Sequence, residues 1–344
     1  MDRFLPHKDE LGELLQAQSE KLLALMQTIN VETLGLSEHG VLYFVGSHYK
    51  RLFFSIQTSA HLLYNSIKLS KKKVEDVVIM DYGAGIGSLY ILAKMIGCKK
   101  VIYNDILEEW KQNALLIAEA IHQDVDEYIV GNIDETLVVL EKKGILCDII
   151  TSRNVIEHIY RLDAFYSIIN QYQPKAIVYS STTANYYNPA MNLQHVLHHT
   201  KTEKVYLQMR IDFIKKNFSQ LSQENISKLA TSTRGYEKSE LIAAVNEFIK
   251  SGKLPSKNYH YTNTCNMDYG VWAENLLPFS FHKAMVEVSG RECIIQSGFW
   301  DTHYTKPWKN KMGNLFNTII AFNKPIGFLL APFIYIIALP QTDK

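Results

Sequence analysis

A buried strand that runs directly into a glycine-rich turn constrains the fold of this chain more than any other feature. Residues 77–80 are apolar, Asp81 follows them, and glycines stand at positions 83, 85 and 87. Glycine permits a sharp turn, and it lets a ligand lie against bare backbone where the next helix begins. The segment 77–88 therefore predicts a ligand-binding turn between a strand and a helix.

Short apolar runs alternate with helical patterns from residue 76 onward. The segments between the runs have the spacing of amphipathic helices, and two further apolar runs, 292–297 and 333–339, follow much later. Five strand–helix alternations indicate an α/β fold with a mainly parallel sheet that helices cover on both faces. The five predicted strands are residues 77–80, 101–103, 128–130, 148–151 and 176–179.

The chain divides into four predicted segments. Apolar residues recur at helical spacing in 9–30 and in 51–68, which predicts two N-terminal helices. Residues after the fifth strand are polar and helix-prone and contain no strand pattern, so we predict an inserted helical cap there. The segments are an N-terminal helical part (1–75), a ligand-binding core (76–190), the cap (191–258) and a C-terminal part that completes the core sheet (259–344).

Charge and cysteine content limit the classes of partner. Lys and Arg number 36 against 35 Asp and Glu, which gives a net charge of +1. Neutralising nucleic-acid phosphates needs a clustered surplus of cations, so we expect a small-molecule partner and no nucleic acid. The four cysteines lie far apart without a CxxC pair, which argues against a metal centre or a disulfide framework. No signal-peptide pattern opens the chain, and we expect a cytoplasmic protein.

The second predicted strand ends in Asn104 and Asp105, about twenty residues after the glycine turn. A carboxylate at this place can accept both hydroxyls of a ribose, which predicts an adenosine-type ligand. An NAD-dependent dehydrogenase or epimerase is one alternative, although its GxGxxG pattern would have Ser88 at the third position. Another alternative is that Asp105 only caps the following helix.

The turn, the acidic strand end and the later run Asn154-Val-Ile-Glu-His158 together resemble class I S-adenosylmethionine (SAM)-dependent methyltransferases. The resemblance covers about residues 76–190 well and the last 85 residues more loosely. It implies SAM as cofactor and a Rossmann-like, seven-stranded, mostly parallel sheet with an antiparallel last strand. The positions that it assigns to the cofactor are Asp81, Gly83, Gly85, Gly87, Asp105, Asn132, Ile133 and Asn154.

Each of these positions has an implied partner in the cofactor. Asp81 and the glycine backbone would hold the methionyl part, and Asp105 would hold the ribose. Asn132 would meet the adenine amino group, where the family usually has an aspartate. An Asn can still accept that hydrogen bond through its side-chain oxygen.

The run that ends in His158 follows the fourth strand, at the sheet edge where ligands of α/β proteins bind. It is similar to the Glu-x-x-Glu-His run of ubiquinone-pathway O-methyltransferases, which helps some relatives bind a divalent metal. Asn154 replaces the first Glu here, so we predict no metal. Methyl transfer is an in-line displacement in which the enzyme aligns the reactants and removes a proton. His158, with Glu157 beside it, is the predicted catalytic base; a purely structural histidine is the alternative.

The acceptor pocket is predicted from the cap and the C-terminal part. The predicted insertion and the Trp272-x-Glu274 segment also resemble enzymes of bacterial surface-glycan or quinone pathways, which implies O-methylation of a sugar, a glycan precursor or an isoprenoid or quinone-type hydroxyl. A non-catalytic scaffold that retains the fold is a further alternative, and the oligomeric state stays open. The candidate substrate residues are Asn185, His199, Arg234 and Trp272.

The C-terminal stretch 312–339 contains a single charge, Lys324. Pro325, Gly327 and Pro332 interrupt any membrane-spanning helix, so we predict a short helix followed by a closing strand at 333–339. Residues 308–322 could still contact a bilayer surface if the acceptor is lipid-linked. The expectation is therefore no transmembrane span, with peripheral contact at the inner face of the membrane as a hypothesis.

Overall fold

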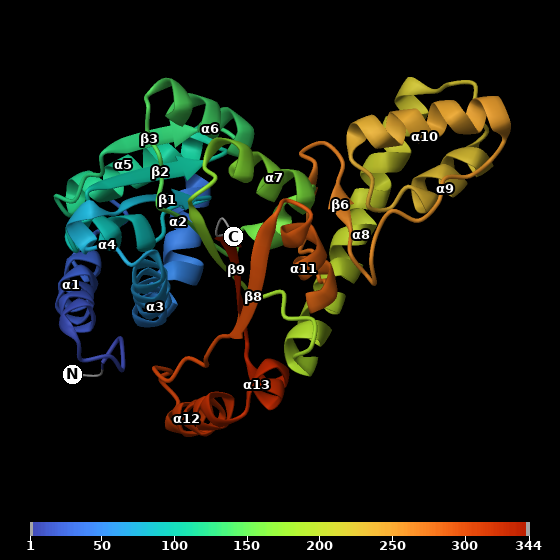
Figure 1. Ribbon diagram of the computed structural model, residues 1–344. Coiled ribbons are helices and arrows are strands. Elements are labelled where there is room, and N and C mark those ends of the chain that lie inside the picture. The colour runs from blue at the N-terminus through green and yellow to red at the C-terminus, as the bar shows by residue number, and fades with distance from the viewer. Residues whose placement is uncertain (1–2, 342–344) are drawn as a thin grey trace.

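The computed structural model describes residues 3–341, and of residues 47–49 the backbone alone. Its centre is a seven-stranded sheet in the order β3-β2-β1-β4-β5-β9-β8 (Figure 1). The first five strands run parallel to one another. The strands are β1 (Val78–Tyr82), β2 (Lys100–Asp105), β3 (Glu127–Val130), β4 (Ile149–Arg153), β5 (Ile177–Thr182), β8 (Arg291–Ser297) and β9 (Ile334–Pro340).

The last strand of the chain is antiparallel and lies inside the sheet. β9 pairs antiparallel with β5 on one side and with β8 on the other, with Val178 and Cys293 both opposite Ala338. Residues 334–338 of β9 are all buried, as expected for a strand that is covered on both faces. The predicted α/β fold, a Rossmann-like seven-stranded sheet with an antiparallel last strand, is confirmed.

Helices cover both faces because successive strand residues point to opposite sides. Ile79 packs into one core cluster and its neighbour Met80 into another. The first cluster includes residues of α1, α3, α4 and α5, and the second includes residues of α6, α7 and α11. These helices are α1 (Glu10–Gln27), α3 (Leu52–Ser70), α4 (Leu89–Met95), α5 (Glu108–Ala120), α6 (Ile133–Lys142), α7 (Leu162–Tyr172) and α11 (Phe279–Glu287).

The predicted cap is an arm of three helices that extends to one side of the sheet (Figure 1). It has a small core cluster of its own. The two-stranded sheet of β6 (Cys265–Asn266) and β7 (Val271–Trp272) lies at its base. The arm helices are α8 (Pro189–Asn217), α9 (Gln223–Ser232) and α10 (Lys238–Ser251).

Short helices join the larger elements. The helix α2 (Glu38–Tyr43), the π-helical turn Phe44–His48 and the 3-10 turn Tyr49–Arg51 lead into α3, and none of them is predicted from the sequence. Two 3-10 turns, Val74–Asp76 and Ile156–His158, precede β1 and follow β4.

The apolar C-terminal stretch contains the predicted helix and strand. α12 (Pro307–Phe322) and α13 (Lys324–Leu330) connect β8 to β9. Within residues 3–341, no helix combines the length and the apolar character that crossing a bilayer requires.

Candidate functional site

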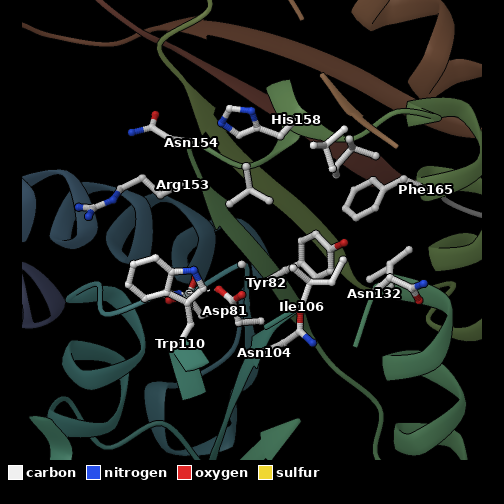
Figure 2. A pocket seen from close by; sticks show the side chains of 18 of the residues that line it. Asp81, Tyr82, Asn104, Ile106, Trp110, Asn132, Arg153, Asn154, His158 and Phe165 are labelled. Carbon is white, nitrogen blue, oxygen red and sulfur yellow. Dashed lines mark hydrogen bonds between the residues drawn. The ribbon is translucent and has the colours of Figure 1, made fainter. Parts of the chain in front are cut away.

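A cavity of about 1050 Å³ lies at the carboxyl edge of the parallel strands. The ends of β1 and β2, the glycine turn after β1, the segment after β4 and helix α7 line it (Figure 2). Pockets for small ligands usually measure about 300–1000 Å³. The cavity therefore has room for an adenosine-type ligand and for part of a second molecule beside it.

The glycine turn presents bare backbone to this cavity. Gly83 and Gly85 have φ values of 67° and 53°, a left-handed conformation that side-chain-bearing residues rarely adopt. A Cβ on Gly83 would lie 2.6 Å from Cγ2 of Val155, so the turn is packed tightly against the segment after β4. A Cβ on Gly85 would meet no atom within 4 Å. Both lie in the wall of the cavity, as does Gly87.

Asp81 is a buried carboxyl group at the end of β1. It accepts a hydrogen bond from the Tyr90 N–H at 3.2 Å, and the Thr151 hydroxyl lies 3.5 Å from its other oxygen. Burial raises the pKa of Asp81 to about 7, although the positive charge of Arg153 acts in the opposite direction. A cationic ligand in the cavity would favour the ionised form of this group.

Asp105, at the end of β2, holds the glycine turn in place. Its Oδ2 accepts from the Gly85 N–H at 3.0 Å, and its Oδ1 accepts from the Leu107 N–H at 3.2 Å. Burial raises the pKa of Asp105, whereas these backbone hydrogen bonds lower it. An ionised carboxylate has about four acceptor positions, so these backbone donors leave acceptor capacity for a hydroxyl group of a ligand.

Asn132 caps helix α6 as well as lining the cavity. Its Oδ1 accepts from the Glu135 N–H at 3.1 Å, and the Glu135 carboxylate accepts from the Asn132 N–H at 3.0 Å. The side-chain oxygen therefore already has one donor before any adenine binds. Ile133 and Ile106 provide apolar surface beside it.

Arg153 is a cavity residue that the sequence analysis does not single out. Its Nη1 donates to the Ser55 carbonyl at 2.7 Å and to the Thr58 hydroxyl at 3.0 Å, which joins β4 to α3. Its Nη2 lies 3.8 Å from the place where a Cβ on Gly87 would stand. A fixed positive charge thus lies beside the glycine turn. The sequence signal was an Arg two residues after a predicted strand, directly before Asn154.

His158 lines the cavity and has a defined tautomer. Its Nδ1 lies 3.0 Å from the Trp272 carbonyl oxygen, which can only accept, so Nδ1 carries a proton. In the neutral ring, Nε2 is then free to take up a proton. Asn154 lies nearby on the same side of the cavity (Figure 2), with a positive φ of 55°.

Glu157 lies outside the cavity wall and inside the protein. It is 2% exposed, its Oε2 has no hydrogen-bond partner among the described residues, and burial raises its pKa. The predicted pair Glu157 and His158 therefore does not share one site.

The four candidate substrate residues are all described by the structure, and none of them is part of the cavity wall. Asn185 donates to the carbonyls of Phe328 and Ala331 at 2.8 Å and fixes the junction of α13 and β9. Trp272 stacks on Tyr160 with ring centroids 5.2 Å apart, so it supports a cavity residue from behind.

His199 and Arg234 hold the arm to the loops beneath it. Burial lowers the pKa of His199 to about 4, so the ring is neutral; Nε2 donates to the Glu274 carbonyl at 2.7 Å, and Nδ1 accepts from the Thr262 hydroxyl. Arg234 donates to the Asn263 carbonyl at 3.0 Å.

A second part of the cavity is apolar and aromatic. Helix α7 and the segment that joins it to the preceding 3-10 turn contribute four of these side chains, α2 and α5 contribute one each, and the loop and strand at the base of the arm contribute two. At the mouth, Tyr43 and Trp110 lie edge to face with centroids 5.6 Å apart. The sequence analysis does not single out these positions, because they belong to the wall only after distant segments meet. They are Tyr43, Trp110, Ile159, Tyr160, Phe165, Ile168, Tyr269 and Val271.

No group of three or more His, Cys, Asp or Glu side chains within residues 3–341 is arranged to hold a metal ion. Burial lowers the pKa of His282 to about 4 and raises that of Cys147 to about 12, so both are neutral core residues.

Comparison with known proteins gives low similarities, and no family model matches the chain. It is 26% identical over 166 residues to an uncharacterized RNA methyltransferase of Clostridium tetani (strain Massachusetts / E88), which is 43% of this chain and 35% of that protein. The chain thus matches about a third of that relative's length.

Two solved structures are similar at a low level. A candidate RNA methyltransferase from Pyrococcus horikoshii has a TM-score of 0.29 and 21% identity, covering 37% of this chain and 60% of that one. Magnesium protoporphyrin IX methyltransferase (ChlM) from Synechocystis PCC 6803, with bound SAH, has a TM-score of 0.39 and 10% identity over 87% of this chain and 96% of that one. The function is therefore inferred from the geometry of the cavity.

Proposed function

We propose that this chain is a SAM-dependent methyltransferase that methylates a hydroxyl group of a small ring-containing or isoprenoid acceptor. One observation supports this most: the Gly85 backbone and the Asp105 carboxylate, joined at 3.0 Å, line the same cavity as the base candidate His158. A nucleoside cofactor and a proton acceptor would thus share one enclosed space at the carboxyl edge of the sheet.

The cofactor side of the cavity matches the three parts of SAM. Asp81 and Arg153 bring opposite charges to the glycine turn, where the ammonium and carboxylate of the methionyl part would lie. Asp105 has acceptor capacity left for the ribose hydroxyls. Ile106 and Ile133 would pack on the adenine, with Asn132 at its edge.

The other side of the cavity suits a flat or apolar acceptor better than a sugar. Tyr160, Phe165 and Ile168 present rings and aliphatic surface, and aromatic side chains bind ring systems by stacking and edge contacts. We therefore favour a quinone-type or other ring hydroxyl over a glycan among the acceptors considered from the sequence.

The chemistry requires alignment and one proton acceptor. Bound SAM supplies an electrophilic methyl group on a sulfonium. His158 Nε2 would take the proton of the acceptor hydroxyl while the oxygen attacks, and the Trp272 carbonyl keeps the ring in the tautomer that leaves Nε2 free. General-base help of this kind is worth about 10²–10⁴-fold in rate.

Isothermal titration of the purified protein with SAM tests the cofactor. We expect binding, a loss of at least about tenfold in affinity for Asp105→Ala because charge-assisted hydrogen bonds disappear, and little change for His158→Ala. Asp212→Ala, an exposed carboxylate on the arm, is the matched control. No binding of SAM at high micromolar concentration would reject the proposal.

Methyl-labelled SAM and a small-molecule extract of the native cells test the acceptor. We expect a labelled product by mass spectrometry and a product yield at least about 10²-fold lower with His158→Ala. Labelled product from any acceptor pool removes the scaffold alternative. An increase in NADH fluorescence on mixing with the protein would instead support the dehydrogenase alternative.

An RNA acceptor is a second candidate. The Clostridium tetani relative bears the name of an RNA methyltransferase, so the expectation that no nucleic acid takes part is not supported. Total RNA from the same cells, incubated with labelled SAM, provides the test. Label in RNA rather than in small molecules would move the assignment to RNA.

A further inference from the structure

Helices α12 and α13 carry six large apolar side chains that are exposed. On α12 the exposed positions, together with the half-buried Ile319, follow one another at steps of four or three residues, which places them on one face of the helix. Phe322 is 89% exposed and Leu315 59%. We call this surface the α12–α13 face; its exposed members are Trp308, Met312, Leu315, Phe322, Ile326 and Leu329.

The opposite side of α12 packs on the protein. Ile320 is buried, and a Cβ on Gly313 would lie 2.7 Å from the Asp301 carbonyl oxygen. Asn317 exchanges hydrogen bonds with the Trp300 backbone at 2.7 and 2.9 Å. These contacts hold α12 in a fixed orientation. Because the opposite side of the helix is packed on the protein, the apolar side chains of the α12–α13 face point to the solvent.

The charge around this face has one sign. Residues 302–341 contain four lysines and no Asp or Glu. Lys311 and Lys324 are exposed, and Lys309 lies on the other flank of the apolar row. An apolar helix face with Trp and flanking lysines is the arrangement that binds an anionic membrane surface, where the lysines meet lipid phosphates and the apolar side chains enter the bilayer boundary.

The fold places this face at the edge of the sheet that holds the cavity. β8 runs parallel to β5, so α12 begins after the carboxyl end of β8, and β9 starts from the same edge. Figure 1 shows α12 and α13 projecting beyond the sheet, away from the arm. A membrane under the α12–α13 face would thus lie at the edge from which the cavity opens.

We propose that the α12–α13 face docks on an anionic lipid membrane, which would present an apolar acceptor to the cavity edge. The docking itself does not depend on the proposed methyl transfer, because it uses none of the cavity residues.

Sedimentation with vesicles, in the absence of SAM, tests the docking. The full chain is mixed with vesicles of phosphatidylcholine alone or with 40% phosphatidylglycerol added, at two salt concentrations. We expect partition onto the anionic vesicles that weakens with salt, and roughly tenfold or greater loss in Leu315→Ser with Phe322→Ser. Lys311→Glu with Lys324→Glu should lower the partition similarly and remove most of the salt dependence.

A matched control uses apolar residues that are as exposed elsewhere. Leu193 and Leu197, on α8, are 59% and 56% exposed, and Leu193→Ser with Leu197→Ser should leave the partition unchanged. Unchanged SAM titration and melting temperature in every variant show that the fold is retained. Failure of the wild-type chain to bind anionic vesicles, or an equal loss in the α8 control, would overturn the proposal.

Sedimentation velocity tests whether a second copy of the chain, rather than a membrane, covers the α12–α13 face. A dimer in solution that the Leu315→Ser with Phe322→Ser variant abolishes would assign the face to a second copy of the chain and overturn membrane docking. A monomer that still binds anionic vesicles would support it.

Discussion

Asp81 would couple ligand binding to pH, because burial raises its pKa to about 7. SAM is cationic at its sulfonium, and its ammonium group would approach the same carboxyl, so the ionised form of Asp81 should bind it better. We expect the affinity for SAM to increase as pH rises from 6 to 8. Titration calorimetry across this range measures it, and Asp81→Asn should flatten the profile.

The same residue affects stability with a defined sign. The pKa of Asp81 lies above its unfolded value near 3.8, so the folded state binds more protons between these values. The free energy of unfolding should therefore fall as pH rises from about 4 to about 7. Asp81→Asn should be more stable than the wild type at pH 8 and not at pH 4, as measured by urea unfolding. Equal pH profiles for both proteins would contradict this assignment.

Single residues also show where sequence reasoning ends. Asp81, Asp105 and the glycines could be placed in the cavity because they follow strand ends directly, and parallel strands bring their carboxyl ends to one edge. Arg153 could not be given its role, since it depends on contact with Ser55, 98 residues away. Trp272 was expected at the acceptor and instead supports Tyr160 and orients His158.

At the scale of elements, the two left-handed glycines of the turn should respond differently to a methyl group. Gly83→Ala adds a clash with Val155 to the cost of a positive φ, so we expect a loss of about 2–3 kcal/mol in stability. Gly85→Ala carries only the conformational cost of about 1 kcal/mol but puts a Cβ into the open space beside the turn. Thermal unfolding should rank Gly83→Ala as the less stable protein.

Binding should show the complementary result. Gly85→Ala should lose more SAM affinity than Gly83→Ala when each loss is compared with the variant's loss of stability. The reason is that the Cβ added at position 85 stands where the ligand would lie. A Gly85→Ala protein that binds SAM like the wild type would show that the ligand does not lie against this backbone.

The helix α8 is joined to the core by a buried ion pair. His195 is held between the Thr183 carbonyl and the Glu274 carboxylate, which both only accept, so both ring nitrogens must carry protons. Burial lowers the pKa of His195, but Glu274 raises it further, and the pKa is raised overall. Burial alone would raise the pKa of Glu274, but the hydrogen bond and charge of His195 outweigh it, so the pKa of Glu274 is lowered overall.

The signs of these shifts define a pH window. The stabilisation that protonated His195 contributes to the folded state is complete below about pH 6.5, and it is lost as pH rises through the raised pKa of His195. The stabilisation that ionised Glu274 contributes is lost as pH falls below about 4.5. Glu274→Gln should therefore cost about 1–3 kcal/mol near pH 6 and less at pH 8.5, by denaturant unfolding. Glu287→Gln, in an exposed pair with Lys283, is the control and should change little. A cost that does not depend on pH would contradict a charged His195.

The start of α8 is the part of the arm that is hardest to read from the sequence pattern. The predicted helical cap covers 191–258, and its first helix, α8, begins at Pro189. Between Pro189 and Tyr206 the buried side chains are His195 and His199, so there is no apolar periodicity to recognise. α2 was missed for a related reason, since it is short and buries only Gly40.

At the scale of the whole molecule, the layered architecture follows from apolar strands between amphipathic helices, and both patterns are readable in the sequence. The position of β9 is harder to read from the sequence. Its hydrophobicity indicates that it is buried on both faces, but not that it lies between β5 and β8. The cavity depends on this assembly, because its wall combines α2, the glycine turn, the segment after β4, α7 and the base of the arm.

The same architecture predicts unequal stability across the molecule. The sheet is covered by two large core clusters, whereas the arm is held by a small cluster that includes Ile214, Leu229, Leu241 and Val245. Fewer buried apolar contacts permit opening at lower free energy, so we expect amides of α9 and α10 to exchange hydrogen sooner than those of β1, β4 and β5.

Hydrogen exchange followed by mass spectrometry at neutral pH gives the readout. Addition of SAM should slow exchange in the glycine turn and in the segment after β4, because ligand binding to the folded state raises the free energy of opening there. Figure 1 shows α9 and α10 on the arm, away from β1 and from the turn that follows it; except at the start of α10, next to the cavity residue Glu237, their amides should keep their rates. If the arm and the central strands exchanged together, the protein would open as one cooperative unit, and the small arm cluster would be stabilised by its attachment through Glu274 and His199 rather than by its own core.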